Sequence, residues 1–125
     1  MSQSVFNIAT TDDPRKLTQS VIQVIDCLNM YQAELARVLG LQCNDIGELS
    51  SAKRCLQPGT EEWNRAILFV RMYQLLFAEF NGDGIAINHW MRSENNVFER
   101  TPHLLIVDDD KLEDVVGFLE TPHDT

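Results

Sequence analysis

The chain has 125 residues, with 10 basic and 19 acidic side chains and a formal net charge of −9. This length predicts one compact domain or two helical subdomains that share a core. The charge repels the phosphate backbone at long range, which argues against a non-specific nucleic-acid binder. No apolar run approaches the ~20 residues that span a bilayer, and residues 1–11 lack the pattern of a secretion signal. We therefore expect a cytoplasmic protein without a membrane segment.

The acidic side chains are concentrated in the C-terminal half. The charge sums to −1 over residues 1–30, to 0 over residues 31–60 and to −8 over the remainder. A basic partner surface could use this asymmetry. The cysteines Cys27, Cys43 and Cys55 form no CxxC pair and have no metal-ligand spacing with histidine, so we expect free thiols.

The N-terminal part reads as a flexible, polar segment over residues 1–12, followed by three helices. Asp13 and Pro14 are typical of a helix start, and apolar residues then recur at helical spacing through Leu28. A second helix is predicted over residues 31–39, with Gly40 as its C-terminal cap. Asp45 and Glu48 predict a capping pair for a third helix that runs to about residue 56.

The C-terminal part predicts four more helices. A long helix should begin at Thr60 and bury one aromatic-rich side, which comprises Trp63, Ile67, Val70, Tyr73 and Phe77. After a turn at residues 81–84, short helices are expected over 85–92, from Thr101 and Pro102, and from the run Asp108 to Asp110. Residues 93–100 read as a loop. No segment alternates as a strand, so the fold class is all-α, a small helical bundle.

Residues 32–41 resemble the first helix and turn of a helix-turn-helix, and residues 45–56 would supply the second helix. Arg37, Lys53 and Arg54 are then the candidate DNA-binding residues. The charges of the second helix cancel, and it lacks a cluster of base-reading side chains. A scaffold with weak or lost DNA binding is therefore favoured over an active DNA reader.

Motifs for catalysis or metal binding are not apparent. The turn at residues 81–84 is similar to the middle of an EF-hand loop, but Trp90 stands where the closing glutamate would be needed. The histidines lack zinc spacing, and the three adjacent aspartates predict capping and an acidic surface rather than a magnesium site. We expect a non-enzymatic protein without cofactor or metal.

From about Val70 to Leu119 the order of residues resembles the toxin-binding domain of the Xre/MbcA/ParS antitoxin family. The matching landmarks are Ala86, Trp90-Met91, Asn95-Asn96, Phe98, Arg100-Thr101-Pro102, Leu104-Leu105 and Val115 through Leu119. The helix-turn-helix-like part upstream is also typical of that family. The resemblance divides the chain into residues 1–12, a helix-turn-helix-like region over 13–69 and a toxin-binding domain over 70–125.

The resemblance implies a bacterial type II antitoxin that binds a RES-domain, NAD-consuming toxin and blocks its active site. It also implies a homodimer and possible repression of its own operon. Carried onto this sequence, the contact residues are Trp90, Arg92, Asn95, Asn96, Arg100, Thr101 and Pro102, with the tail to about His123 nearby. The main alternative is a DNA-binding transcriptional regulator that uses residues 31–56.

The residue types fit such a contact, although each could also serve only the fold. A tryptophan can anchor an apolar contact, and the two arginines offer forked donors to carboxylates or carbonyls. Two departures from the family pattern stand in the loop. Glu94 replaces a proline, and Glu99 replaces a glycine, so the backbone freedom of glycine should not be required at position 99.

Overall fold

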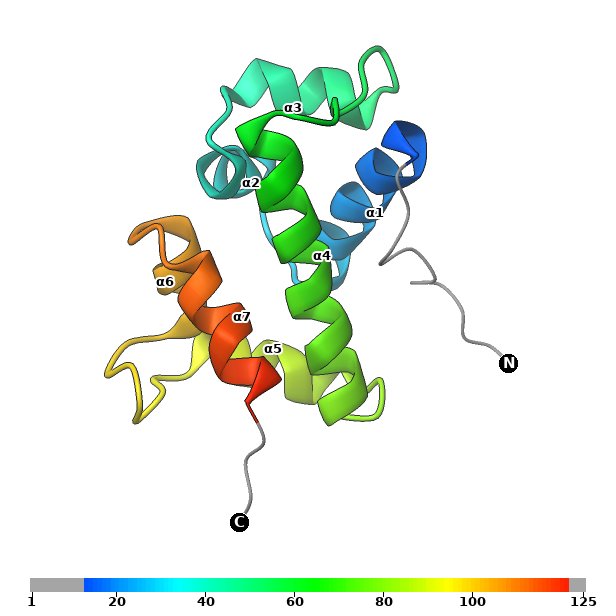
Figure 1. Ribbon diagram of the computed structural model, residues 1–125. Coiled ribbons are helices and arrows are strands. Elements are labelled where there is room, and N and C mark those ends of the chain that lie inside the picture. Colours follow the sequence, from blue (N-terminus) through cyan, green and yellow to red (C-terminus); the bar gives the residue numbers. More distant parts are fainter. Residues whose placement is uncertain (1–12, 122–125) are drawn as a thin grey trace.

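The computed structural model describes residues 13–121, so the expected flexible segment at 1–12 and the tail at His123 lie outside the described part. Within that part the chain folds into helices connected by short turns, as the sequence predicts (Figure 1). The helices are α1 Pro14–Cys27, α2 Gln32–Leu39, α3 Cys43–Ser50, α4 Glu61–Glu79, α5 Gly84–Arg92, α6 Pro102–Val107 and α7 Leu112–Glu120. The all-α fold class is confirmed. None of the described helices is both long and apolar enough to cross a membrane.

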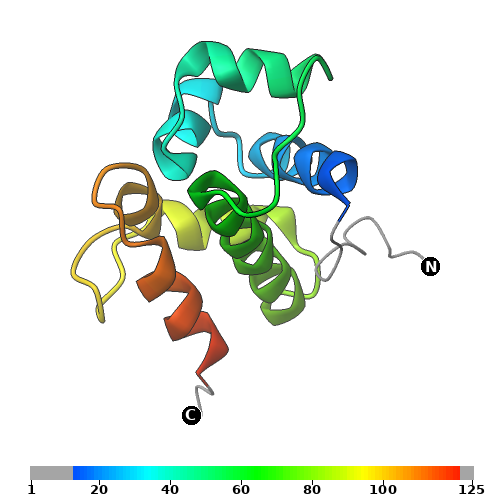
Figure 2. The same cartoon turned by 45° about the horizontal axis from the view of Figure 1, so that its top comes forward.

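The long helix α4 forms the centre of the bundle, because α1, α2, α5 and α7 all pack against it. In Figure 1, α1 lies to the right of α4 and α3 lies across its upper end, while α2, α6 and α7 lie to its left. Figure 2 shows the same arrangement with the upper end turned toward the viewer. The expected domain boundary between residues 69 and 70 falls inside α4, which continues through it without interruption. One hydrophobic core extends over both parts of the chain.

The buried side of α4 is wider than the predicted stripe. Trp63, Val70 and Tyr73 are buried as expected, but Phe77 is 39% exposed and Ile67 is only partly buried. Other buried positions, such as Phe69 and Leu76, lie between them along the helix. A helix that packs against neighbours on several sides buries more than one stripe, which a single periodic pattern does not describe.

Both predicted boundaries of the third helix are wrong. Helix α3 begins earlier than Asp45, which instead accepts a hydrogen bond from the Gln42 amide at 3.0 Å. The helix also ends at Ser50 rather than near residue 56, because Ala52 adopts a left-handed conformation with φ of 65°. The Lys53 amide then donates to the Glu48 carbonyl at 2.9 Å, which closes the helix in the manner usually seen with glycine.

The run Asp108 to Asp110 does not start the last helix. Asp108 ends α6, Asp110 has a left-handed φ of 56°, and Lys111 precedes the first residue of α7. The three carboxylates form ion pairs with arginines from other parts of the chain. These pairs fix the connection between α6 and α7, as described below.

Candidate partner-binding surface

The turn between α4 and α5 sets the direction in which α5 leaves the bundle. Asn81 and Gly82 both have left-handed φ values, of 53° and 77°, and the Gly82 amide donates to the Phe77 carbonyl at 2.8 Å. The carboxylate of Asp83 then accepts hydrogen bonds from the Ile85 and Ala86 amides at 3.1 and 3.2 Å. This motif, which is similar to part of an EF-hand loop, therefore uses its aspartate as a helix cap.

Helix α5 presents different chemistry on each of its sides. Ile87 and Met91, four residues apart, are buried in the core. Asn88 and Arg92, also four residues apart, bind the end of α1. The remaining sides carry Ala86 and Trp90, which are half-buried, and Ile85 and His89, which are exposed. The helix thus holds itself in place with two sides and leaves the other two accessible.

Arg92 binds within the molecule. Its guanidinium donates hydrogen bonds to the Leu28 and Asn29 carbonyls, at 3.1 and 3.0 Å, just beyond the last turn of α1. The Asn88 amide group donates to the Cys27 carbonyl at 3.0 Å. Helix ends leave such carbonyls without intrahelical partners, so α5 caps α1. Arg92 was predicted as a partner contact, and these bonds give it a structural role.

Trp90 joins α5 to the last helix through stacked aromatic rings. Its ring lies 6.4 Å from that of Phe118 with an interplanar angle of 19°, and Phe98 meets the same Phe118 edge-on at 5.3 Å. Trp90 stays partly exposed beside this cluster. It is therefore held in one orientation before any partner binds, which lowers the entropic cost of using it as an anchor.

The loop over residues 93–101 is fixed by its own hydrogen bonds. The Asn95 side-chain oxygen accepts from the Val97 amide at 2.8 Å, and the Asn95 amide donates to the Arg100 carbonyl at 3.1 Å. The expectation about Glu99 is wrong, because this residue has a left-handed φ of 59°. Position 99 therefore still requires the left-handed conformation that glycine adopts freely, and the family pattern has glycine at this position. Asn96, at the tip of the loop, is exposed.

The residues after the loop also have partners within the molecule. The Arg100 guanidinium binds both carboxylate oxygens of Asp109. The Thr101 hydroxyl accepts a hydrogen bond from the Leu104 amide at 3.3 Å and caps α6, and Pro102 is buried in the first turn of that helix. Of the predicted contact residues, Trp90 and Asn96 are the ones left most available to a partner.

A groove of about 410 Å³ runs alongside α5, and we call it the α5 groove. It is lined by Phe80, Asp83, Ile85, Ala86, His89, Trp90, Ser93, Glu94 and Asn95. Trp90 and Asn95 were predicted as contact residues, whereas Phe80, Ile85 and His89 were missed. The sequence carries no local signal for them, because Ile85 is distinguished from Ile87 and Met91 only by its place off the buried side of α5.

The candidate DNA-binding residues lie in the α2–α3 region, and two of them form ion pairs. Arg37 binds Asp108 at 3.2 Å, and Arg54 binds Asp45 at 2.6 Å. Lys53 is exposed at the end of α3. Helices α2 and α3 are joined by a three-residue turn whose Gly40 has a left-handed φ of 77°, as predicted. The helix pair is present, but two of its three candidate cations are neutralised.

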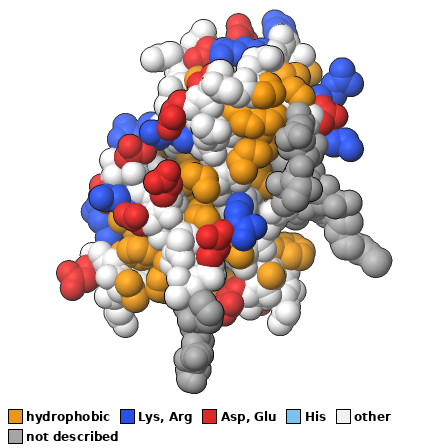
Figure 3. All heavy atoms as spheres, in the orientation of Figure 1, with side chains coloured by type: hydrophobic (Ala, Val, Ile, Leu, Met, Phe, Trp, Pro, Cys, Tyr) orange, Lys and Arg blue, Asp and Glu red, His pale blue; other side chains and the backbone are white. Residues whose placement is uncertain are grey.

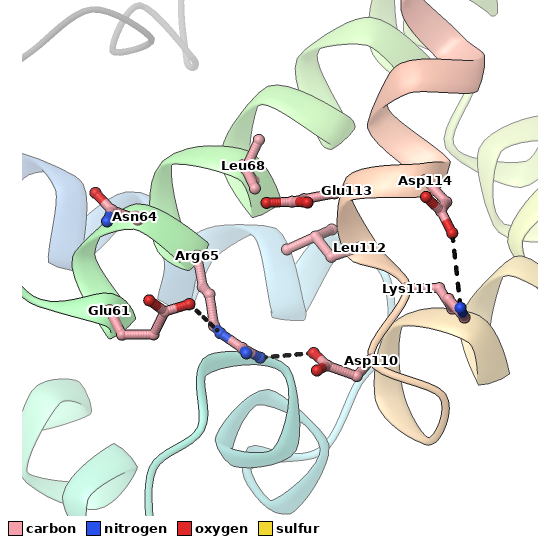
Figure 4. Close-up of a pocket in the computed structure, with 9 residues that line it drawn as sticks. All are labelled: Glu61, Asn64, Arg65, Leu68, Asp110, Lys111, Leu112, Glu113 and Asp114. Carbon is pink, nitrogen blue, oxygen red and sulfur yellow. Dashed lines mark hydrogen bonds and ion pairs between the residues drawn. The ribbon is translucent and has the colours of Figure 1, made fainter.

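The three adjacent aspartates each face a different arginine, and we call this arrangement the aspartate clasp. Asp108 pairs with Arg37 of α2, Asp109 with Arg100 of the loop, and Asp110 with Arg65 of α4. Figure 4 shows Arg65 held between Glu61 and Asp110, at 3.1 and 2.8 Å, at the edge of a polar pocket. In Figure 3, acidic and basic side chains alternate over the α6–α7 side of the surface.

A buried histidine and a half-buried glutamate join α2 to α6. His103 is 8% exposed, and its Nε2 lies 2.8 Å from the Glu34 carboxylate, which also accepts the Tyr31 amide at 3.0 Å. Partial burial raises the pKa of Glu34, but the hydrogen bonds from Tyr31 and His103 outweigh it, so the pKa of Glu34 lies below its usual value. The ionised carboxylate is therefore part of the junction.

The cysteines and other metal-ligating side chains form no further site in the described part. Cys27, Cys43 and Cys55 are free thiols. Burial raises the pKa of Tyr73 to about 12, and a hydrogen bond with the neighbouring Cys27 thiol adds to this shift. Within residues 13–121, no group of three or more His, Cys, Asp or Glu side chains could hold a metal ion.

Comparison of the sequence with protein-family models and with curated proteins finds no significant match.

Proposed function

We propose that the protein is an antitoxin-like binding module of a bacterial type II toxin–antitoxin system. It binds a RES-domain, NAD-consuming toxin and occludes the toxin's active site. The observation that carries the proposal is the preformed edge made by Trp90, the exposed Asn96 and the loop between them. This edge is fixed by internal hydrogen bonds yet leaves an aromatic ring and an amide available. Such preorganisation favours tight binding to one protein surface.

The left-handed backbone at Glu99 also supports the proposal. The antitoxin family pattern has glycine at this place, and the described structure adopts the conformation that glycine favours even though glutamate is present. The local chain path is therefore the one that the family's residues would select. The Thr101 cap and the buried Pro102 fix the following helix in the same manner.

The test is co-expression with the product of the neighbouring gene. We expect that product to be a RES-type toxin that lowers cellular NAD and stops growth, and we expect the wild-type chain to restore both. Asn96→Arg should weaken the purified complex more than Lys53→Ala, since both residues are exposed but only Asn96 belongs to the proposed edge. The absence of both a complex and growth rescue would contradict the proposal.

A homodimer forms part of the proposal, because the resembling antitoxins commonly dimerise. Light scattering coupled to size-exclusion chromatography measures the mass directly and compares it with the 14.3 kDa of one chain. A monomer at all concentrations would remove the dimer from the proposal without affecting the toxin contact.

DNA binding is the second candidate function, and it is favoured by the α2–turn–α3 pair with its left-handed Gly40. The net charge of −9 and the ion pairs of Arg37 and Arg54 oppose it. Titration of the protein with its own promoter fragment tests this function, and true binding should weaken steeply as salt is raised. Lys53→Ala should weaken DNA binding relative to the wild type, whereas it should leave the toxin complex unchanged.

A further inference from the structure

The α5 groove combines an apolar lining with acidic side chains at its border. Phe80, Ala86 and Trp90 line it, and Ile85, which is 86% exposed, extends its apolar wall. Ile87 and Met91 of the same helix are buried, so Ile85 is the large aliphatic side chain that α5 leaves outside the core. The groove therefore offers apolar surface that a partner side chain could cover.

The charge around the groove is of one sign. Its lining includes the carboxylates of Asp83 and Glu94 and contains neither lysine nor arginine. Arg92, the nearest cation in sequence, points to the end of α1 and binds carbonyls there. Arg100 is neutralised by Asp109. The acidic border thus has no compensating cation among the residues that line the groove.

We propose that the α5 groove binds a segment of a protein partner in which a large apolar side chain is flanked by lysine or arginine. The inference rests on the proposed function in taking α5 and its loop as the binding surface, and it adds the chemistry of the bound segment. The apolar side chain would fill the space between Ile85 and Trp90, while the flanking cations would face Asp83 and Glu94. Opposite charges at such a border raise the association rate and select among partners.

A second copy of this chain fits the groove less well. The protein carries a net charge of −9, and residues 61–125 hold most of it. Docking one acidic border against another copy would bring like charges together, which costs free energy. A basic segment has the opposite effect, since its cations are attracted to the acidic side chains at the border of the groove.

The experiment uses the full-length protein and a random peptide library of about 12 residues. Peptides are selected on the wild-type protein and counter-selected on Ile85→Ser, which removes the apolar wall at an exposed position. We expect the recovered sequences to share a large apolar residue next to lysine or arginine. Recovery of sequences without basic enrichment, or of sequences that bind Ile85→Ser equally well, would overturn the inference.

Binding of the consensus peptide to variants then separates the two contributions. Ile85→Ser should weaken binding about tenfold, as expected for lost apolar burial. Glu94→Gln should weaken it about two- to fivefold and reduce its salt dependence. Val97→Ser is the matched control, since Val97 is 67% exposed in the neighbouring loop and does not line the groove. An equal loss with Val97→Ser would contradict the assignment to the groove.

The outcomes distinguish this inference from the proposed function. If the peptides behave as expected but no RES-type toxin is bound, the inference about the groove is supported and the proposed identity of the partner is contradicted. The opposite result is that the toxin is bound, Ile85→Ser and Glu94→Gln leave its affinity unchanged, and the selection yields no basic peptides. That result would contradict the inference about the groove and leave the proposed function intact. A wild-type dimer that Ile85→Ser dissociates would show that a second copy occupies the groove, which also overturns the inference.

Discussion

At the scale of single residues, the polar side chains of the predicted surface have more roles within the fold than the sequence indicates. An arginine near a tryptophan has the same appearance in a sequence whether it binds a partner or caps a helix. Arg92 donates to two carbonyls at the end of α1, and Arg100 pairs with Asp109. The Arg92 contact joins residues more than 60 positions apart in the sequence, and a local sequence pattern does not contain such a contact.

Arg92→Ala should therefore destabilise the fold. The change leaves the Leu28 and Asn29 carbonyls without their charged donor, and hydrogen bonds to charged groups contribute about 1.5–3 kcal/mol. The free energy of unfolding, measured with urea, should fall by roughly that amount. Arg71→Ala is the control, because Arg71 forms an exposed pair with Glu120 and should cost less than about 1 kcal/mol. Equal losses in the two variants would contradict the capping role.

Glu99→Gly should stabilise the protein. Glu99 holds a left-handed φ of 59°, which costs a non-glycine residue about 1 kcal/mol, and glycine removes that strain. The free energy of unfolding should rise by a few tenths to about 1 kcal/mol, since glycine also gives the unfolded chain more freedom. Asn96→Gly, in the same loop and without a left-handed φ, should instead lower stability. A loss in both variants would show that position 99 has no strain to relieve.

At the scale of elements, the junction between α2 and α6 depends on one ionised carboxylate. Glu34 binds His103 and the Tyr31 amide, and its pKa is lowered despite partial burial. A carboxyl with a lowered folded pKa stabilises the protein above its unfolded pKa of about 4.3, and that contribution is lost as the pH falls through the folded value. The stability of this junction should therefore decrease in acid.

Glu34→Gln tests this dependence. The variant should be less stable than the wild type near neutral pH, and the difference should shrink as the pH falls below about 4. Denaturant midpoints measured over this range give the comparison. Glu79→Gln, at an exposed position at the end of α4, is the control for the loss of one negative charge. A difference between wild type and Glu34→Gln that stays constant with pH would contradict the role of the ionised carboxylate.

At the scale of the whole molecule, the sequence predicts the helices well and their junctions poorly. Periodic apolar positions and the signals at Pro14, Gly40 and Thr60 identify real helix starts and ends. The end of α3 is missed because Ala52, a residue without turn preference, takes the left-handed conformation. The α5 groove is missed for a related reason, since Ile85 gains its meaning only when Ile87 and Met91 are known to occupy the core.

The aspartate clasp is the feature of the whole fold that most needs an experiment. It joins the α6–α7 connection to α2, to the loop and to α4 through Arg37, Arg100 and Arg65. Asparagine has nearly the same shape as aspartate and tolerates the left-handed conformation of Asp110, so replacing all three aspartates removes charge with little steric change.

The variant with Asp108→Asn, Asp109→Asn and Asp110→Asn should unfold at lower denaturant, by roughly 1–2 kcal/mol in total for three partly exposed pairs. A matched triple variant, Glu79→Gln, Glu94→Gln and Glu99→Gln, removes the same charge from exposed positions outside these pairs. It should match or exceed wild-type stability, because it lessens the repulsion of a protein with net charge −9. The gap between the two variants should narrow at about 1 M salt, where ion pairs are screened. If both variants change stability equally at low salt, the clasp contributes no specific attraction to the stability of the fold.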